Sequence, residues 1–321
     1  MRTRFLVTGG EQYPDAVNRP EGARFKQAKL LSVDIKSGAV DVLLRHESAY
    51  PTGAPNSIYV SGSLSGGRIY LATSTQIFVY SYPDLKLLKS KSLPFFQNLH
   101  HIVAVKEGIA VAVTGLDLVV VLNEQTLEPT NFYHALGKDP WHKYSMDKDY
   151  REIISLKPHE SHPNYIFQFK DDLWITRFNQ KDIICLSDMS KRISIDVERL
   201  HDGFVQGNYV YLTSVNGCVI KADLKTLTIK KVLDLNKIEN AKTPLGWCRG
   251  LFVEGDLVYV GFTRIRETKV KENLKWAASI VKGAKEWPTR IAVYDFEKEE
   301  KLAAYELPVD SISAIYSVIG I

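Results

Sequence analysis

Short runs in which apolar and polar residues alternate recur along most of the chain. Alternation with a period of two is typical of β-strands that bury one face. The clearest group of four such runs covers 203–235 and reads GFVQ, YVYLTSV, CVIKADL and IKKVLDL. Comparable groups cover 165–197, 102–133, 58–92 and 251–307, the last with a long insertion. The pattern predicts an all-β protein built from four-stranded antiparallel units.

The two ends of the chain supply the parts of a sixth unit. RFLVTGG, KLLSVDIKS and AVDVLLRH predict three N-terminal strands, and SISAIYSVIGI (311–321) predicts one C-terminal strand without partners. Four-stranded units repeated every 40–60 residues or so are typical of a β-propeller, in which radial repetition protects the sheet edges. We therefore predict a single six-bladed propeller domain over 1–321, with blade one closed by the terminal strands. A pair of β-sandwiches is the alternative, but it leaves the terminal strands unexplained.

One polar or charged position recurs just before the apolar residues of each innermost strand. Because these strands line the central channel and start at the same face, the positions are expected to form a ring at one mouth of the channel. The ring consists of Asn56, His100, Asn164, His201 and Arg249, with a residue between Ser311 and Ser313 in the sixth unit.

This ring contains residue types that bind metals and anions. Imidazole nitrogens and amide oxygens bind divalent cations, so His100, His201 and Asn164 are predicted metal ligands, with Zn, Fe or Mn favoured over Ca. The planar guanidinium of Arg249 fits a carboxylate or a phosphate. The same residues are predicted to be catalytic, and Asn56 and Asn164 to contact substrate. The alternative is that polar channel residues only bind water and neighbouring backbone.

The long insertions of the chain fall on the links that a propeller places at the face bearing this ring. They cover 10–28, 134–163, 234–248 and 264–288, whereas the turns predicted for the other face are short. Function concentrates on loops that a rigid scaffold positions, so we expect these segments to cover a pocket. KENLKWAASIVKGAKEW (271–287) has helical periodicity and is expected to form a lid, or else to pack on the flank or in a dimer contact.

Several side chains of the insertions are candidates for substrate binding or catalysis. Trp141 and Trp247 are expected to stack on the substrate, and Arg264 and Arg266 to add positive charge. In the segment HESHPN, His162 or Glu160 is expected to act as a general acid or base or as a further metal ligand. Cys248 would be a nucleophile only if Arg249 lowered its pKa, and otherwise is an inert buried thiol. His101 is expected to pack between blades.

Composition narrows the class of protein further. The chain has 321 residues, a formal net charge of +4, 45% apolar residues and three widely spaced cysteines. The small charge, apparently spread along the chain, does not favour binding to nucleic acid or to a membrane surface. The cysteines do not suggest disulfides, and no segment resembles a signal peptide or a membrane helix. We expect a cytoplasmic protein without a nucleotide cofactor, and leave its oligomeric state open.

The six-unit pattern with its polar ring resembles the gluconolactonase-like and strictosidine-synthase-like propellers. That resemblance implies a divalent cation in the channel mouth, held by Glu, Asn and Asp, and hydrolysis of lactones or esters. Asn56 and Asn164 match the amide roles, but His100 and His201 stand where carboxylates are expected. The phrases HPNYIFQFKDDLWITRF and GWCRGLFVEGDLVYVGFTRIR also resemble a bacterial propeller family of unknown function.

The sequence thus favours an enzyme that acts on a small polar substrate, anionic or sugar-like, in the channel mouth. His100 and His201 would bind a metal or act as acid and base, and Arg249 would hold a carboxylate, carbonyl or phosphate. The expected reaction is hydrolysis, elimination or isomerisation next to a carbonyl. The alternative is a propeller without catalytic activity that binds a ligand or a protein partner.

Overall fold

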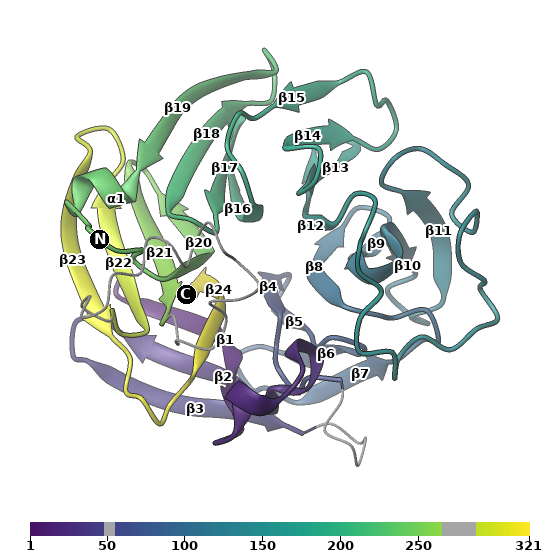
Figure 1. Ribbon diagram of the computed structural model, residues 1–321, viewed down its shortest axis with the longest axis horizontal. Coiled ribbons are helices and arrows are strands. Elements are labelled where there is room, and N and C mark those ends of the chain that lie inside the picture. Colours follow the sequence, from purple (N-terminus) through teal and green to yellow (C-terminus); the bar gives the residue numbers. More distant parts are fainter. Residues whose placement is uncertain (48–54, 265–286) are drawn as a thin grey trace.

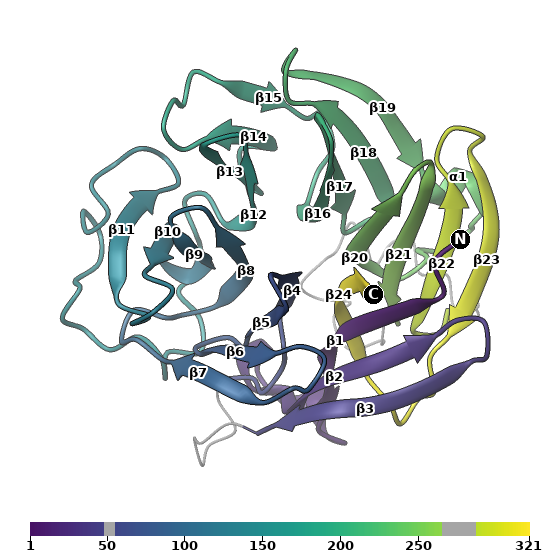
Figure 2. The same ribbon diagram turned by 180° about the vertical axis from the view of Figure 1, so that it is seen from behind.

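The computed structural model describes residues 1–47, 55–264 and 287–321, and these form six four-stranded antiparallel sheets arranged in a ring (Figure 1). The strands closest to the centre are β4, β8, β12, β16, β20 and β24, and Figure 2 shows the same ring from behind. The predicted all-β, six-bladed propeller is therefore confirmed. Blades one to three consist of β24 (Ala314–Gly320), β1 (Arg4–Gln12), β2 (Phe25–Asp34) and β3 (Ala39–His46); β4 (Ser61–Ser65), β5 (Arg68–Ala72), β6 (Ile77–Ser81) and β7 (Leu87–Lys91); and β8 (Leu99–Val105), β9 (Gly108–Val113), β10 (Leu118–Leu122) and β11 (Pro129–His134).

The other three blades follow the same order from the inside outwards. They consist of β12 (Pro163–Phe169), β13 (Asp172–Arg177), β14 (Asp182–Cys185) and β15 (Arg192–Ser194); β16 (Leu200–Gln206), β17 (Tyr209–Ser214), β18 (Cys218–Asp223) and β19 (Thr228–Asp234); and β20 (Trp247–Glu254), β21 (Leu257–Thr263), β22 (Arg290–Asp295) and β23 (Glu300–Glu306). The described helical elements are the 3₁₀ turns η1 (Ala16–Asn18), η2 (Glu21–Ala23) and η3 (Thr114–Leu116), and α1 (Leu235–Ile238).

Blade one is closed by the two ends of the chain, as predicted. The C-terminal β24 pairs with β1 from Phe5–Gly320 to Gly10–Ala314. Gly9 is required here, because a Cβ at this position would lie 1.8 Å from the carbonyl oxygen of Ala314. Pairing the ends in one sheet removes the open edge that an inner strand of blade one would otherwise lack.

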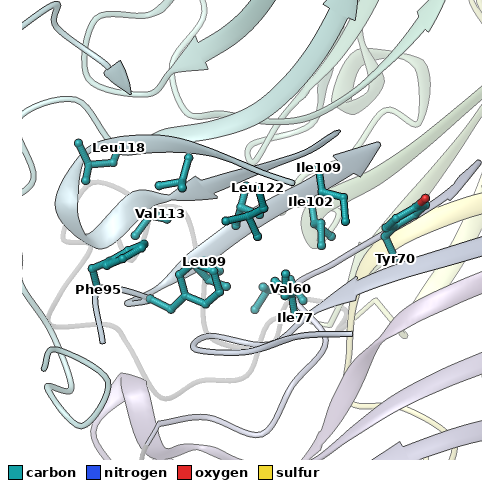
Figure 3. Close-up of a cluster of buried hydrophobic side chains, with 14 of the residues drawn as sticks. Val60, Tyr70, Ile77, Phe95, Leu99, Ile102, Ile109, Val113, Leu118 and Leu122 are labelled. Atoms are coloured by element: carbon teal, nitrogen blue, oxygen red, sulfur yellow. The ribbon is translucent and has the colours of Figure 1, made fainter. Parts of the chain in front are cut away.

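The hydrophobic core lies between neighbouring blades. Figure 3 shows one such cluster, in which Val60, Tyr70 and Ile77 of blade two meet Leu99 and Ile102 of blade three. Middle strands such as β10 are buried on both faces, and their sequence LVVVL is accordingly apolar throughout. Outer strands such as β3 and β23 alternate between exposed and half-buried residues. Sheet-on-sheet packing therefore explains both the apolar and the alternating runs.

The structure differs from the sequence-based boundaries at two places. The inner strand of blade two begins at Ser61 rather than at Ile58, because Ile58, Tyr59 and Val60 are buried against neighbouring blades, with the Tyr59 N–H bonded to Gly9 O at 3.0 Å. The helix α1 was not predicted; its first turn is capped by the Asp234 carboxylate. The predicted lid helix at 271–287 lies almost entirely outside the described residues. None of the helices in the described part is long and apolar enough to cross a membrane.

Candidate functional site

A cavity of about 1140 Å³ lies where the inner strands begin. Two predicted insertions contribute most of its loop lining, through residues between 12 and 25 and between 151 and 162. The other two contribute Trp247 and Arg264 from their described parts. The prediction that the insertions surround one pocket on the ring-bearing face therefore agrees with the described residues.

β-Bulges at the start of the inner strands direct side chains into this cavity. In β8 the register passes from Leu99–Val113 to His101–Ala112, which leaves His100 as the extra residue. A register shift also accompanies Tyr316 in β24. Bulges commonly redirect side chains next to functional sites, and both His100 and Tyr316 line the cavity.

His201 is the most clearly positioned side chain of the site. Its Nδ1 lies 2.9 Å from Asp202 Oδ2, and this carboxylate oxygen also accepts the Gly250 N–H at 2.9 Å. Because a carboxylate accepts, the hydrogen-bond network assigns the proton to Nδ1 and leaves the lone pair on Nε2. Nε2 is buried and has no hydrogen-bond partner among the described residues.

Burial sets the protonation state of this pair. It lowers the pKa of His201, and the nearby Arg249 charge lowers it further, so the imidazole is neutral at pH 7. Burial raises the pKa of Asp202, but His201 and the Gly250 N–H outweigh that effect and the net change is a decrease. The pair is therefore a neutral imidazole held by a carboxylate, as in acid–base dyads and in the outer shell of metal-bound histidines.

His100 has the same arrangement with a different acceptor. Its Nδ1 donates to Asn98 O at 3.0 Å, which leaves Nε2 as the acceptor. The ring centroid lies 5.5 Å from that of His201 and 5.0 Å from that of His162. Burial, and then the neighbouring His201, holds the pKa of His100 well below its usual range. Two adjacent imidazoles thus present basic nitrogens in one cavity.

His162 and His159 are held in place by a carboxylate from the neighbouring blade. Asp117 accepts the backbone N–H groups of Glu160, Ser161 and His162 at 2.7, 3.0 and 2.6 Å. The Nδ1 atoms of His159 and His162 lie 2.5 Å apart, so one donates to the other. Burial, and then His100, lowers the pKa of His162 well below its usual range. The sequence analysis did not single out Asp117, which is one polar residue in an otherwise apolar segment.

Arg249 and Tyr316 form a cation–π pair in the cavity lining. The guanidinium carbon lies 4.4 Å from the ring centroid of Tyr316, and Arg249 Nε is buried without a hydrogen-bond partner in the described chain. The Tyr316 ring lies 6.5 Å from that of His201. Tyr316 fixes the cation beside the imidazoles, which is a suitable place for an anionic group. The only sequence signal for Tyr316 was its position in the predicted C-terminal strand.

The two ring asparagines are structural residues, which corrects their predicted roles. Asn56 Oδ1 accepts the Arg24 and Phe25 N–H groups, and its Nδ2 donates to Glu21 O, so the amide is fully used although the residue lines the cavity. Asn164 is 2% exposed, does not line the cavity and donates to Leu200 O at 2.8 Å, which ties blade four to blade five. The predicted metal set of His100, His201 and Asn164 is therefore not assembled at the cavity surface.

Of the predicted loop side chains, Trp247 and Arg264 line the cavity and Trp141 does not. Trp141 packs against Phe95 and Phe132, with ring centroids 5.8 and 5.2 Å apart, so its predicted stacking on substrate is wrong. Apolar surface left open beside blade three explains this placement, since an indole buries a large area. Arg266 lies outside the described residues.

Two further side chains behave as the structural alternatives predicted. His101 is 8% exposed and packs between blades three and four, 4.6 Å from the Tyr165 ring, with its Nδ1 accepting the Ile166 N–H. Cys248 is buried, and burial raises the pKa of its thiol well above the usual range. This excludes an activated thiolate at Cys248.

A second histidine group lies away from the cavity. Donor atoms of His134, His142 and Glu160 come within 4.8 Å of one another, which is close enough for a metal. However, His134 Nδ1 accepts the Leu136 N–H, so its proton is on Nε2, the atom that faces Glu160. Lys138 already pairs with the same Glu160 oxygen at 2.8 Å. The hydrogen bonds therefore favour a proton-bridged cluster over a metal centre here.

The cavity concentrates positive charge that the linear sequence appears to spread. Its lining contains one acidic residue, Glu21, which pairs with Lys157 at 3.0 Å. The whole chain has a formal charge of only +4. The basic residues of the lining are Arg24, Arg151, Lys157, Arg199, Arg249 and Arg264.

No protein-family model and no curated protein sequence matches the chain. Its structure is similar to a chain in the crystal structure of a nidogen/laminin complex, with a TM-score of 0.59, 10% identity, and coverage of 98% of this chain and 97% of that one. It is also similar to apo AztD from Citrobacter koseri, with a TM-score of 0.50, 11% identity, and coverage of 100% and 98%. At these identities the likeness shows the propeller fold alone.

Proposed function

We propose that this protein is an enzyme that carries out acid–base chemistry on a small anionic or sugar-like substrate in the cavity. The proposal rests on one observation: His201 Nε2 is basic and unpartnered among the described residues, while Asp202 holds Nδ1. An unsatisfied buried nitrogen is costly unless a ligand or water completes it. His201 is the proposed general base, and Arg249 the proposed anchor for a carboxylate or phosphate.

The chemistry follows from these positions. His201 would take a proton from water or from a carbon next to a carbonyl, and Asp202 would stabilise the resulting imidazolium. Arg249 would hold the negative charge that develops on the substrate oxygen. His100 and His162 are candidates to return a proton to the leaving group or product. Hydrolysis, elimination and isomerisation next to a carbonyl all use these steps.

A metal-assisted version of this activity is the second candidate. His100 and His201 both donate from Nδ1 to an acceptor and keep Nε2 free, which is the usual arrangement of metal-bound histidines. A bound Zn, Fe or Mn ion would polarise a carbonyl or activate water. The protein residues would then orient the substrate through Arg249 and accept a proton at His162.

The non-catalytic alternative has less support. A partner protein needs an exposed surface, whereas the four histidines here lie in a recessed cavity. A cytoplasmic location also remains a proposal, supported by three cysteines that form no disulfide.

The test is a substrate screen with matched variants. Wild type, His201→Gln and Arg249→Lys would be assayed against lactones and against carboxylated and phosphorylated sugars, with His142→Gln as a histidine control outside the cavity. Turnover lost in the first two variants and kept in the control supports the proposal. Equal turnover in all four proteins would overturn it.

Elemental analysis of the same preparations separates the two mechanisms. About one equivalent of a transition metal, absent from a His100→Ala, His201→Ala double variant, would establish the metal-assisted version. Full activity in metal-free protein would exclude it.

A further inference from the structure

Arg199 occupies a special backbone position at the cavity mouth. It immediately precedes β16 and has a φ of 64°, in the left-handed region. Asn98 before β8 and His162 before β12 have φ values of 52° and 62°, and all three residues line the cavity. The corresponding residue before β20 is Gly246, with a φ of 136°. The turn into four successive inner strands therefore requires positive φ.

This conformation favours glycine, which has no Cβ to clash with the following carbonyl. Blade six uses glycine at the position, so the turn itself does not need a side chain. An arginine there keeps an unfavourable backbone conformation and places a cation at the cavity. The Val215 N–H, bonded to Arg199 O at 2.9 Å, holds the residue in this turn. Strained residues of this kind cluster at ligand sites.

The cavity is also larger and more cationic than one small anion needs. Its volume of about 1140 Å³ is at the upper end for small-molecule sites, which span roughly 300–1000 Å³. Its lone acidic lining residue among those described, Glu21, is paired with Lys157. The positive charge of Arg199 and Arg249, on neighbouring blades, is thus not balanced by other acidic groups of the described lining.

We propose that Arg199 forms a second anion subsite, and that the ligand carries at least two phosphate or carboxylate groups, one bound by Arg249 and one by Arg199. This inference rests on the proposed function for its first subsite. It specifies the substrate class as an extended, multiply anionic compound.

The experiment compares probes that differ by one anionic group. Isothermal titration calorimetry would measure binding of a hexose bisphosphate and the matching hexose monophosphate to wild type and to Arg199→Gly. Glycine suits the left-handed φ, so this variant removes the guanidinium without straining the turn. Wild type should bind the bisphosphate about tenfold more tightly, and Arg199→Gly should lose most of that preference while binding the monophosphate as wild type does.

Controls separate this inference from the proposed function. Arg249→Ala should weaken both probes, and Arg199→Lys should keep part of the preference. A preference that persists in Arg199→Gly, or wild type that does not discriminate between the probes or binds neither at millimolar concentration, would overturn the second subsite. Binding with the expected pattern in His201→Gln, together with no activity in any screen, would retain the subsite and reject catalysis.

Discussion

His201 and Asp202 are consecutive in the chain and are also hydrogen-bonded to each other, with 2.9 Å between Nδ1 and Oδ2. Consecutive residues of a regular strand point to opposite faces, so this contact needs an irregular backbone. The bulge in β16, between the pairs Leu200–Ser214 and Gly203–Leu212, provides it. The proposed base and its positioning residue therefore depend on one local irregularity.

Replacing Asp202 with Asn tests this pairing. The amide oxygen can still accept from His201 and Gly250, but the negative charge that stabilises imidazolium is lost. We expect the pKa of His201 to fall further, and kcat to fall about 10- to 100-fold once a substrate is known. An NMR titration of the histidine rings measures the pKa without any substrate. An unchanged His201 titration would show that the carboxylate does not act on the ring.

Stability should decrease on acidification because the site histidines are buried in the neutral form. Burial lowers the pKa of His101 to about 4 and lowers those of His100 and His201 as well. Between about pH 6.5 and pH 4 the unfolded chain therefore binds more protons than the folded one. The stabilisation is fully present above pH 6.5 and is lost as the pH falls through this range.

Urea unfolding at pH 7 and pH 5 measures this loss. His101→Gln keeps an acceptor for the Ile166 N–H but cannot be protonated, so its free energy of unfolding should depend less on pH than that of wild type. An identical pH dependence in the two proteins would contradict the assignment.

Asp117 should be important for stability because it accepts three backbone N–H groups. Its replacement by Ala leaves those buried donors unsatisfied and should lower the free energy of unfolding by about 3 kcal/mol. Asp117→Asn keeps an amide oxygen and tolerates the observed φ of 58°, so it should cost only about 1 kcal/mol. Chemical denaturation of both variants checks the order, and equal losses would argue against the hydrogen-bond explanation.

The left-handed turn at Arg199 predicts an unusual tolerance of glycine. Arg199→Gly relieves backbone strain while it makes the unfolded chain more flexible, so stability should stay within about 1 kcal/mol of wild type. Arg45→Gly, on the exposed edge of β3, has no strain to relieve and should lose about 1 kcal/mol. Thermal unfolding of the two variants compares them directly, and a larger loss at Arg199 would show that its side chain is needed for folding.

The propeller could be predicted because its determinants are local and repeated. Each blade needs alternating or wholly apolar runs and short turns, and both are visible in segments such as YVYLTSV. The closure by β1 and β24 followed from counting strands. The ring prediction also identified His100, His201 and Arg249, since residues that begin inner strands must meet at one mouth of the channel.

The ring prediction was wrong for the asparagines because sequence position gives a location but not a hydrogen-bond partner. Asn56 and Asn164 stand in the same slot as the histidines, yet their amides bond to backbone groups of adjacent segments. Trp141 was misassigned for a similar reason, since packing on Phe95 and Phe132 depends on how the loop folds back.

The sequence by itself determined the blade count, the closure and the place of the site, because strand periodicity and turn spacing are written in consecutive residues. Only the tertiary structure decided which side chains enter the cavity, because β-bulges and left-handed turns redirect single residues without changing the hydrophobic pattern. It also gathered Arg24, Arg199 and Arg249 into one cationic lining. These residues are far apart or unremarkable in the chain, and they meet because the propeller brings the starts of all its inner strands to one mouth.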